Sequence, residues 1–322
     1  MGFEQINITE VPSDLGSVYR GKSRGPGAFT NAGLLRKLAA SGMGLRIEAT
    51  ALAAGDFAWA SSTREPNGAR NEAKCVEACG QVQRVIGQRL ASMGPEKTFQ
   101  LIFSGECLYC PAILSAYWHY LSGTGRRVGI IYVDADCDLY TPVEPNSTGN
   151  IAGMTLTHLT LRDGALESMK EFSRPDGSGV VDSNNIVLFG LNIDSPANKR
   201  EHLGYLFDNN FRVVTSQTVQ KAPLEQAREA LKWLEDRVDL ILVHLDVDVI
   251  DPGLFPLGNV PSWTGLGFKE TMAAVKVFLN SQKTVGLSVA EVNPDHAPGL
   301  TMTGQLLDEI IEGLKERQTS RN

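Results

Sequence analysis

The sequence lacks several features that would each point to a particular class of protein. None of its apolar runs reaches the roughly 18 residues that a membrane-spanning helix needs, and its first residues show neither the basic nor the apolar segment of a secretion signal. Its five cysteines are an odd number, which argues against a disulfide framework. We therefore expect a cytoplasmic protein with reduced thiols and no membrane partner.

Positive charge is also scarce. The chain has 30 Lys and Arg against 37 Asp and Glu, a formal net charge of −7, and no basic block or tail offsets that balance. Because nucleic acids and anionic membranes attract basic surfaces, we expect the protein to bind neither. The absence of a repeat of fixed period argues against a scaffold built of repeats.

The remaining composition is that of a globular α/β protein. Of the 322 residues, 42% are hydrophobic and 21% are charged, and no linker or shift in composition divides the chain. Such a chain is long enough to bury a large core. We predict a single domain over residues 1–322.

Short apolar or β-branched runs alternate with longer segments of helical periodicity, an order typical of parallel βαβ units. The predicted strands are 4–9, 45–50, 99–103, 128–133, 185–189, 211–215, 240–245 and 285–290. The predicted helices are 30–40, 71–93, 111–121, 224–235, 268–280 and 303–316. Several strands are apolar throughout, as strands covered on both faces must be. We therefore predict an α/β domain with a mostly parallel sheet of about eight strands.

Aspartates follow two of the predicted strands directly. They are Asp134, Asp136 and Asp138 after the strand at 128–133, and Asp246 and Asp248 after the strand at 240–245. Ligands in parallel sheets bind at the carboxyl ends of the strands, and ionised carboxylates packed there need protons or cations to neutralise them. Oxygen ligands in this number suit Mg²⁺, Mn²⁺ or a similar divalent ion, and two ions could share bridging carboxylates. The alternative is that these residues are helix caps and solvated turn aspartates.

His244 lies two residues before Asp246. Since side chains alternate along a strand, the imidazole should face the same way as the carboxylates of Asp246 and Asp248. It could supply a nitrogen ligand or a general base. The alternative is a core histidine that orients a carboxylate.

Motifs along nearly the whole chain resemble those of the ureohydrolase family, which includes arginase, agmatinase and formiminoglutamase. The matching segments are Gly25-Pro-Gly-Ala-Phe-Thr-Asn-Ala-Gly-Leu-Leu-Arg36, Ser104-Gly-Glu-Cys107, Val133-Asp-Ala-Asp-Cys-Asp138, Thr148-Gly-Asn-Ile-Ala-Gly153, His244-Leu-Asp-Val-Asp-Val-Ile-Asp-Pro252 and Glu291-Val-Asn-Pro294. The resemblance implies a three-layer α/β/α fold, a binuclear Mn²⁺ centre and the hydrolysis of guanidino or related C–N bonds. It also implies a homo-oligomer, either a trimer or a hexamer.

The resemblance further implies that four of the aspartates bind metal, namely Asp134, Asp138, Asp246 and Asp248. Cys107 and Asp136 stand at the two positions where the family has histidine. A carboxylate can replace imidazole at Mn²⁺, so Asp136 is expected to coordinate too, whereas a thiolate at Cys107 would favour Zn²⁺ or Fe²⁺. Alternatively, the excess of carboxylates raises some of their pKa values until they are protonated.

The same comparison of motifs bears on the substrate. Glu291 matches the family acid that pairs with the substrate guanidinium, and Thr148 and Asn150 lie in a loop resembling the one that contacts the amino-acid end of arginine. The proton-shuttling histidine of that loop is Ala152 here, and Asp194 is displaced by one position from the family contact to the substrate amino group. We therefore expect a small-molecule substrate other than free L-arginine.

Taken together, the resemblance implies a divalent-metal hydrolase that cleaves a C–N bond of a guanidino, amidino or related amide compound. In this interpretation Asp138 orients the attacking hydroxide, Glu291 holds the substrate and His244 carries a proton. Two alternatives stay open. One is a non-catalytic relative that acts by association with a partner, and the other is a metal-dependent enzyme that forms or rearranges C–N bonds.

Overall fold

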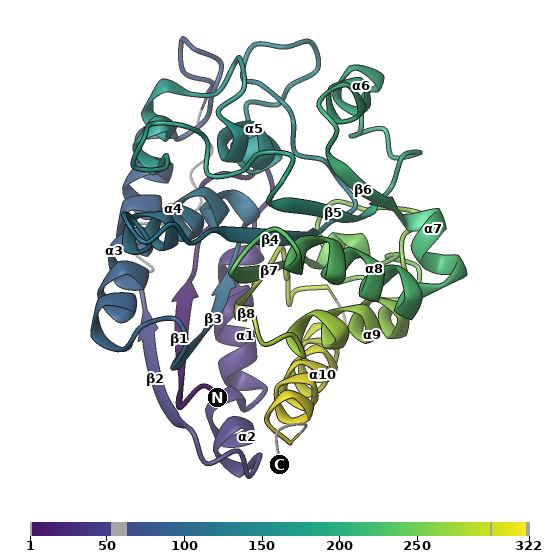
Figure 1. Cartoon of the computed structure of the whole chain (residues 1–322). Helices are drawn as coiled ribbons and strands as arrows, with labels where there is room; N and C mark the ends of the chain where they lie inside the picture. Colours follow the sequence, from purple (N-terminus) through teal and green to yellow (C-terminus); the bar gives the residue numbers. More distant parts are fainter. Residues whose placement is uncertain (1, 53–62, 297, 320–322) are drawn as a thin grey trace.

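The computed structural model describes residues 2–52, 63–296 and 298–319, and within them eight strands form one sheet in the order β2-β1-β3-β8-β7-β4-β5-β6 (Figure 1). Every neighbouring pair is parallel. The strands are β1 (Gln5–Val11), β2 (Arg46–Ala51), β3 (Thr98–Ser104), β4 (Val128–Val133), β5 (Ile186–Leu191), β6 (Arg212–Thr215), β7 (Leu240–Asp246) and β8 (Thr284–Ala290). The predicted eight-stranded sheet is confirmed, and each strand falls where the apolar runs place it.

Helices cover both faces of the sheet, so the fold has the predicted three layers (Figure 1). Alternation along β4 divides its side chains between the two cores: Tyr132 packs with α3 and α4, whereas Ile131 and Val133 pack with α8, α9 and α10. The helices are α1 (Gly25–Asn31), α2 (Leu34–Ala40), α3 (Glu72–Met93), α4 (Cys110–Tyr120), α5 (Thr155–Thr160), α6 (Arg200–Asp208), α7 (Ser216–Lys221), α8 (Pro223–Glu235), α9 (Phe268–Leu279) and α10 (Gly299–Thr319). None of the helices in the described part of the chain combines the length and the apolar character that crossing a bilayer requires.

The helix predicted over 30–40 is wrong as a single element. The chain forms α1 and α2 instead, and they are separated at Gly33, whose φ of +90° is a conformation that glycine adopts without strain. The short helices α5, α6 and α7 were not predicted, because so few residues carry too little periodicity to detect.

The order of the strands determines which loops meet. β3, β8, β7 and β4 are neighbours at the centre of the sheet and run in the same direction. Their carboxyl ends therefore deliver residues 105–107, 291–293, 246–248 and 134–138 to one edge. Both predicted aspartate clusters lie at this edge.

Candidate metal centre

The two aspartate clusters converge on one small, largely buried pocket of about 80 Å³, called here the inner pocket. All six positions predicted as metal ligands line it: Cys107, Asp134, Asp136, Asp138, Asp246 and Asp248. Glu291, at the end of β8, lines it as well. Segments that are more than 100 residues apart in the sequence thus bring their acidic side chains to the same place.

Each cluster begins with the same local turn. The backbone N–H of Asp136 donates to Oδ1 of Asp134 over 2.7 Å, and the N–H of Asp248 donates to Oδ1 of Asp246 over 3.0 Å. In both turns the first aspartate, at a strand end, accepts a hydrogen bond from the amide two residues on, which fixes one of its carboxylate oxygens. These turns explain why acids spaced by two follow both strands.

Asp138 is held by a residue of its own strand, β4, and by a residue that follows β3. Its Oδ2 accepts a 2.6 Å hydrogen bond from the Tyr132 hydroxyl and lies 3.5 Å from Sγ of Cys107. Its φ of +50° belongs to the left-handed region, which a residue other than glycine rarely adopts. The backbone is thus held in an uncommon conformation at a residue that faces the inner pocket.

Burial dominates the electrostatics of the cluster. It raises the pKa of Asp138 to about 7 and that of Asp136 to about 6. Burial, followed by repulsion from the neighbouring aspartates, raises the pKa of Asp134 well above its usual range. Ionised carboxylates in this arrangement are unfavourable unless cations lie among them.

His244 lies beneath the cluster, in the row of residues that crosses β4, β7 and β8. Its ring stacks on Tyr132 with 4.7 Å between centroids, and its Nδ1 lies 2.8 Å from Oγ of Ser288. The side chain is buried, and among the described residues no group bonds to its Nε2. Burial lowers the pKa of His244 to about 3, so the imidazole is neutral and can offer a lone pair.

The positions of these atoms suit cation binding. Asp134, His244 and Asp246 each place one ligand atom within 4.8 Å of the others, and so do Cys107, Asp246 and Glu291. Oδ1 of Asp248 is also buried and unbonded within the described part of the chain. Buried carboxylates and a neutral imidazole with an unbonded nitrogen offer the lone pairs that divalent ions require, so the residues present fit such ions.

Cys107 is a buried thiol rather than an exposed nucleophile. Its Sγ lies 3.3 Å from the carbonyl oxygen of Ala152 and accepts a hydrogen bond from Thr155 Oγ1 at 3.3 Å. Burial, followed by the charge of Asp138, raises the pKa of this thiol well above its usual range. The thiolate that Zn²⁺ or Fe²⁺ would require therefore forms only if a cation lies next to it.

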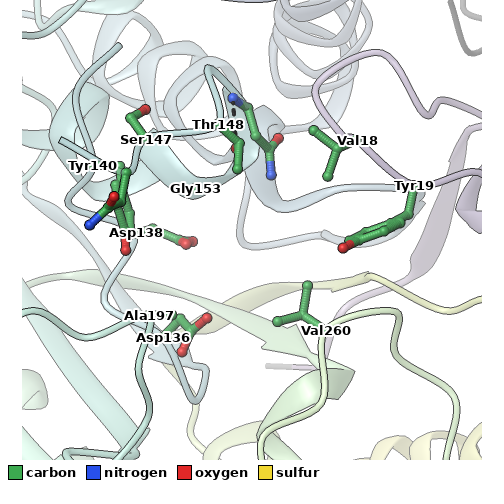
Figure 2. Close-up of a pocket in the computed structure, with 12 residues that line it drawn as sticks. Val18, Tyr19, Asp136, Asp138, Tyr140, Ser147, Thr148, Gly153, Ala197 and Val260 are labelled. Carbon is green, nitrogen blue, oxygen red and sulfur yellow. Dashed lines mark hydrogen bonds between the residues drawn. The ribbon is translucent and has the colours of Figure 1, made fainter. Parts of the chain in front are cut away.

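A wider pocket of about 220 Å³ leads to the cluster (Figure 2). Thr148 and Asn150, which we expect to bind the substrate, are among the residues that line it, and Tyr19 and Val260 lie on the side opposite to Tyr140. Asp136 and Asp138 line both this outer pocket and the inner one. A molecule that fills the outer pocket therefore reaches the aspartates.

Two predicted functional residues lie apart from these pockets. Asp194 is exposed, accepts a 2.8 Å hydrogen bond from Gln217 and is not among the described residues that line either pocket. His244 is close to the aspartates but does not line either pocket within the described chain. Its contacts favour a nitrogen ligand over a group that reaches the substrate.

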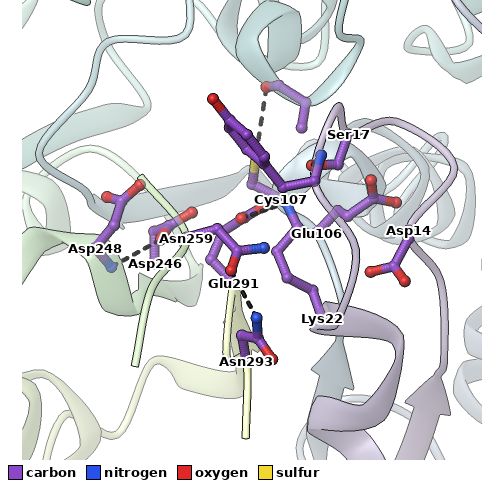
Figure 3. A network of polar contacts seen from close by, with 12 residues as sticks. Asp14, Ser17, Lys22, Glu106, Cys107, Asp246, Asp248, Asn259, Glu291 and Asn293 are labelled. Atoms are coloured by element: carbon purple, nitrogen blue, oxygen red, sulfur yellow. Dashed lines mark hydrogen bonds and ion pairs between the residues drawn. The ribbon is translucent and has the colours of Figure 1, made fainter. Parts of the chain in front are cut away.

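The sequence reasoning missed two buried residues of this site. Lys22 is 2% exposed, lines the inner pocket and forms an ion pair with Glu291 (Figure 3). Glu106 lies beside it, accepts a 3.0 Å hydrogen bond from Ser13 Oγ, and has its pKa raised to about 8 by burial. Lys22 carries no signal, because a lysine in a glycine-containing loop is usually a surface residue. Glu106 lies within the quoted motif Ser104-Gly-Glu-Cys107, but no role was assigned to it.

Comparisons with known proteins agree with this architecture. The model of the Arginase family matches residues 4–314. An arginase of Staphylococcus aureus (strain MRSA252) is 28% identical over 299 residues, which cover 90% of this chain and 91% of the relative. The native structure of arginase from Bacillus caldovelox is similar with a TM-score of 0.82 and 22% identity, covering 97% of this chain and 98% of that one. The crystal structure of formimidoylglutamase from Bacillus subtilis subsp. subtilis str. 168 is similar with a TM-score of 0.72 and 17% identity. The match covers 98% of this chain and 88% of that one.

Proposed function

Since the chain belongs to the arginase family, we propose that it is a metal-dependent hydrolase that cleaves a C–N bond of a guanidino, amidino or related amide compound other than free L-arginine. The observation that carries this proposal is the convergence of the two aspartate clusters on the inner pocket. A hydrolase of this class needs cations next to its substrate, and here the aspartates line the pocket that a substrate would enter.

The residues that would hold the cations are the five aspartates, with His244 as a nitrogen ligand and Cys107 as a sulfur ligand. Two ions are proposed, as the family resemblance implies, because Asp246 places an oxygen within 4.8 Å of ligand atoms of Asp134 and His244 and also within 4.8 Å of Sγ of Cys107, so two ions could share it. Mn²⁺ is the ion that the family resemblance favours, and coordination by Cys107 would shift the preference toward Zn²⁺ or Fe²⁺. Bound divalent cations would supply hydroxide at neutral pH, because they lower the pKa of water.

The protein's own groups would orient the reactants. Asp138 has one carboxylate oxygen fixed by Tyr132, so its remaining oxygen is positioned to accept a proton from the attacking water. Thr148 and Asn150 offer polar groups to the far end of a substrate in the outer pocket. Tyr19 and Val260 would add apolar contact surface on the side opposite to Tyr140.

Two features support a substrate other than free arginine. Ala152 lines the inner pocket with a methyl group, so the proton carrier that the resemblance places there has no counterpart at this position. The carboxylate of Asp194, which would be the nearest match to an amino-group contact, is bonded to Gln217 on the surface. The α-amino group of arginine therefore loses an expected partner.

A panel of guanidino, amidino, ureido and amide compounds provides the test. Incubated with Mn²⁺-treated protein, at least one compound is expected to gain a water and split at a C–N bond, whereas L-arginine stays intact. Mass spectrometry of the products measures this, with chelator-treated protein as the control. Hydrolysis of L-arginine, or turnover that survives chelation, would contradict the proposal.

A further inference from the structure

Lys22 brings a positive charge into the inner pocket. Among the described residues that line this pocket it is the only basic one, and its partner is Glu291 (Figure 3). We propose that Lys22 takes the place of a substrate cation at Glu291, and that the group entering the inner pocket is a neutral carbonyl group of a ureido or amide compound rather than a guanidinium. This inference rests on the proposed hydrolase function and narrows its substrate class.

The loop that carries Lys22 is fixed on one side by Asp14. The carboxylate of Asp14 accepts hydrogen bonds from the backbone N–H of Gly21 at 3.2 Å and of Ser23 at 2.8 Å. It also accepts a 2.7 Å hydrogen bond from the Ser23 hydroxyl. The residues on both sides of Lys22 are thus bonded to one buried acid, which sets the direction of the lysine side chain.

The opposite side of the loop is fixed by two asparagines. Nδ2 of Asn259 donates to the carbonyl oxygen of Arg20 at 3.2 Å, and Nδ2 of Asn293 donates to Oδ1 of Asn259 at 2.7 Å. Gly21 has a φ of +114°, and a Cβ there would lie 2.4 Å from Oδ1 of Asn293. Only glycine allows this close approach without strain.

A second glycine allows the loop to reach the sheet. A Cβ on Gly105, just after β3, would lie 1.8 Å from the carbonyl oxygen of Ser13 and 3.2 Å from the backbone carbon of Lys22. The absence of a side chain there lets Lys22 approach the strand ends. Lys22 is therefore held in the pocket by the contacts that fix its loop.

The charge on Lys22 is maintained by its neighbours. Burial alone would lower the pKa of the ammonium, but its acidic neighbours, Glu291 first among them, outweigh that effect and hold the pKa above its usual range. An ammonium of this kind stays protonated at neutral pH. The ammonium of Lys22 thus compensates the negative charge of Glu291.

A guanidinium fits this arrangement poorly. It carries N–H donors and no acceptor, and the acid with which it would pair already binds Lys22. The other acids among the described residues of the inner pocket are the aspartates assigned to the cations. A guanidinium at Glu291 would also lie next to the ammonium, and like charges repel.

A carbonyl oxygen fits the same place well, because it accepts a hydrogen bond from the ammonium. In hydrolysis the oxygen of water adds to the carbonyl carbon, and the electron pair of the C=O bond moves to the oxygen that faces Lys22. That electron pair then re-forms the C=O bond while the C–N bond breaks with its electron pair on nitrogen, which takes a proton from the added water. The positive charge of Lys22 stabilises the negative charge that forms on oxygen, and water is the only co-reactant.

Binding of methylurea and of methylguanidinium to the Mn²⁺-treated protein tests the inference by ligand-observed NMR. The wild-type protein is expected to prefer methylurea, and Lys22→Met is expected to shift the ratio of the two affinities toward methylguanidinium by about tenfold or more, because one like charge is removed. Lys232→Met, on the exposed face of α8, is the control for loss of a lysine and should keep the wild-type ratio. If Lys22→Met does not fold, Lys22→Gln removes the charge while keeping a hydrogen-bond donor.

The outcomes separate this inference from the proposed function. A wild-type preference for methylguanidinium, an unchanged ratio in the Lys22 variant, or no gain of methylguanidinium binding would overturn the inference. Turnover of a guanidino compound would also overturn it while leaving the hydrolase intact. A shifted ratio in a protein without turnover would support the role of Lys22 and count against hydrolysis.

Discussion

Replacement of Asp246 by Asn is expected to lower the affinity for Mn²⁺ by at least about 100-fold. Mutation of a residue that only hydrogen-bonds to a metal ligand already lowers metal affinity by about 10–100-fold, and loss of a ligand should lower it further. Asp246 places an oxygen in both groups of closely spaced ligand atoms. Turnover of any substrate found should be lost with the cations. Isothermal titration calorimetry measures the affinity, and the product assay measures the turnover.

The same variant distinguishes loss of the site from loss of the fold. Asn retains an oxygen that can accept the hydrogen bond from the N–H of Asp248, so the turn should persist. Burial raises the pKa of Asp246 well above its usual range, which means that the acid destabilises the metal-free fold at high pH. Metal-free Asp246→Asn should therefore unfold at a higher urea concentration than the wild type at pH 8.

The matched control is Asp194→Asn, which removes one acid from the surface, where its partner is Gln217. It should leave the affinity for Mn²⁺ unchanged. Wild-type affinity in Asp246→Asn, or equal losses in both variants, would show that Asp246 is not a ligand.

The stability of the metal-free protein is expected to fall as the pH rises from about 4 to about 7. In the unfolded chain an aspartate loses its proton near pH 4, whereas in the fold burial raises the pKa of Asp136 to about 6 and that of Asp138 to about 7. Between these limits the five aspartates of the pocket keep protons that the unfolded chain has lost, which outweighs the opposite contribution of the buried, neutral histidines His158 and His244, so the free energy of unfolding decreases with pH. Deprotonation of Asp138 alone should lower the free energy of unfolding by about 4 kcal/mol at pH 7 and above, because each unit by which the fold raises a pKa corresponds to about 1.36 kcal/mol.

Urea unfolding of chelator-treated protein at pH 5, 6, 7 and 8 measures this dependence. Asp138→Asn should reduce the slope between pH 5 and pH 7, since the variant carries no proton there. Added Mn²⁺ should reverse the trend, because cations bind deprotonated carboxylates and their contribution grows with pH. If the free energy of unfolding of the metal-free protein stays constant or rises between pH 5 and pH 7, the pocket aspartates do not have the raised pKa values that burial without cations would cause.

The strands and the aspartate clusters could be predicted because their causes are local. Strands that are covered on both faces have continuous apolar sequences, which can be recognised directly. Ligand-binding loops begin at the carboxyl ends of parallel strands, so the aspartates that follow a predicted strand indicate a site. The order of the strands has no such local cause. Nothing in the sequence states that β7 lies between β8 and β4, yet this order brings Glu291 to the two clusters.

Lys22 could not be predicted for the same reason. Its burial depends on contacts of its loop with residues far away in the sequence: Asn259 and Asn293 bond to the carbonyl oxygen of Arg20, and Gly105 lies against the backbone of Lys22. His244 was an intermediate case. Its direction followed from strand alternation, but its contacts with Tyr132 and Ser288 depend on the registers of β4 and β8 with β7.

If divalent cations neutralise the converging aspartates, chelator-treated protein should bind Mn²⁺ when titrated with it. We expect two bound ions per chain and, for each site at 100 times its dissociation constant, a gain of about 3 kcal/mol in the free energy of unfolding. Parallel titrations with Zn²⁺ and Fe²⁺ identify the preferred ion. A folded protein that binds none of the three and is not stabilised by them would rule out a metal centre at the aspartates and favour a non-catalytic member of the family.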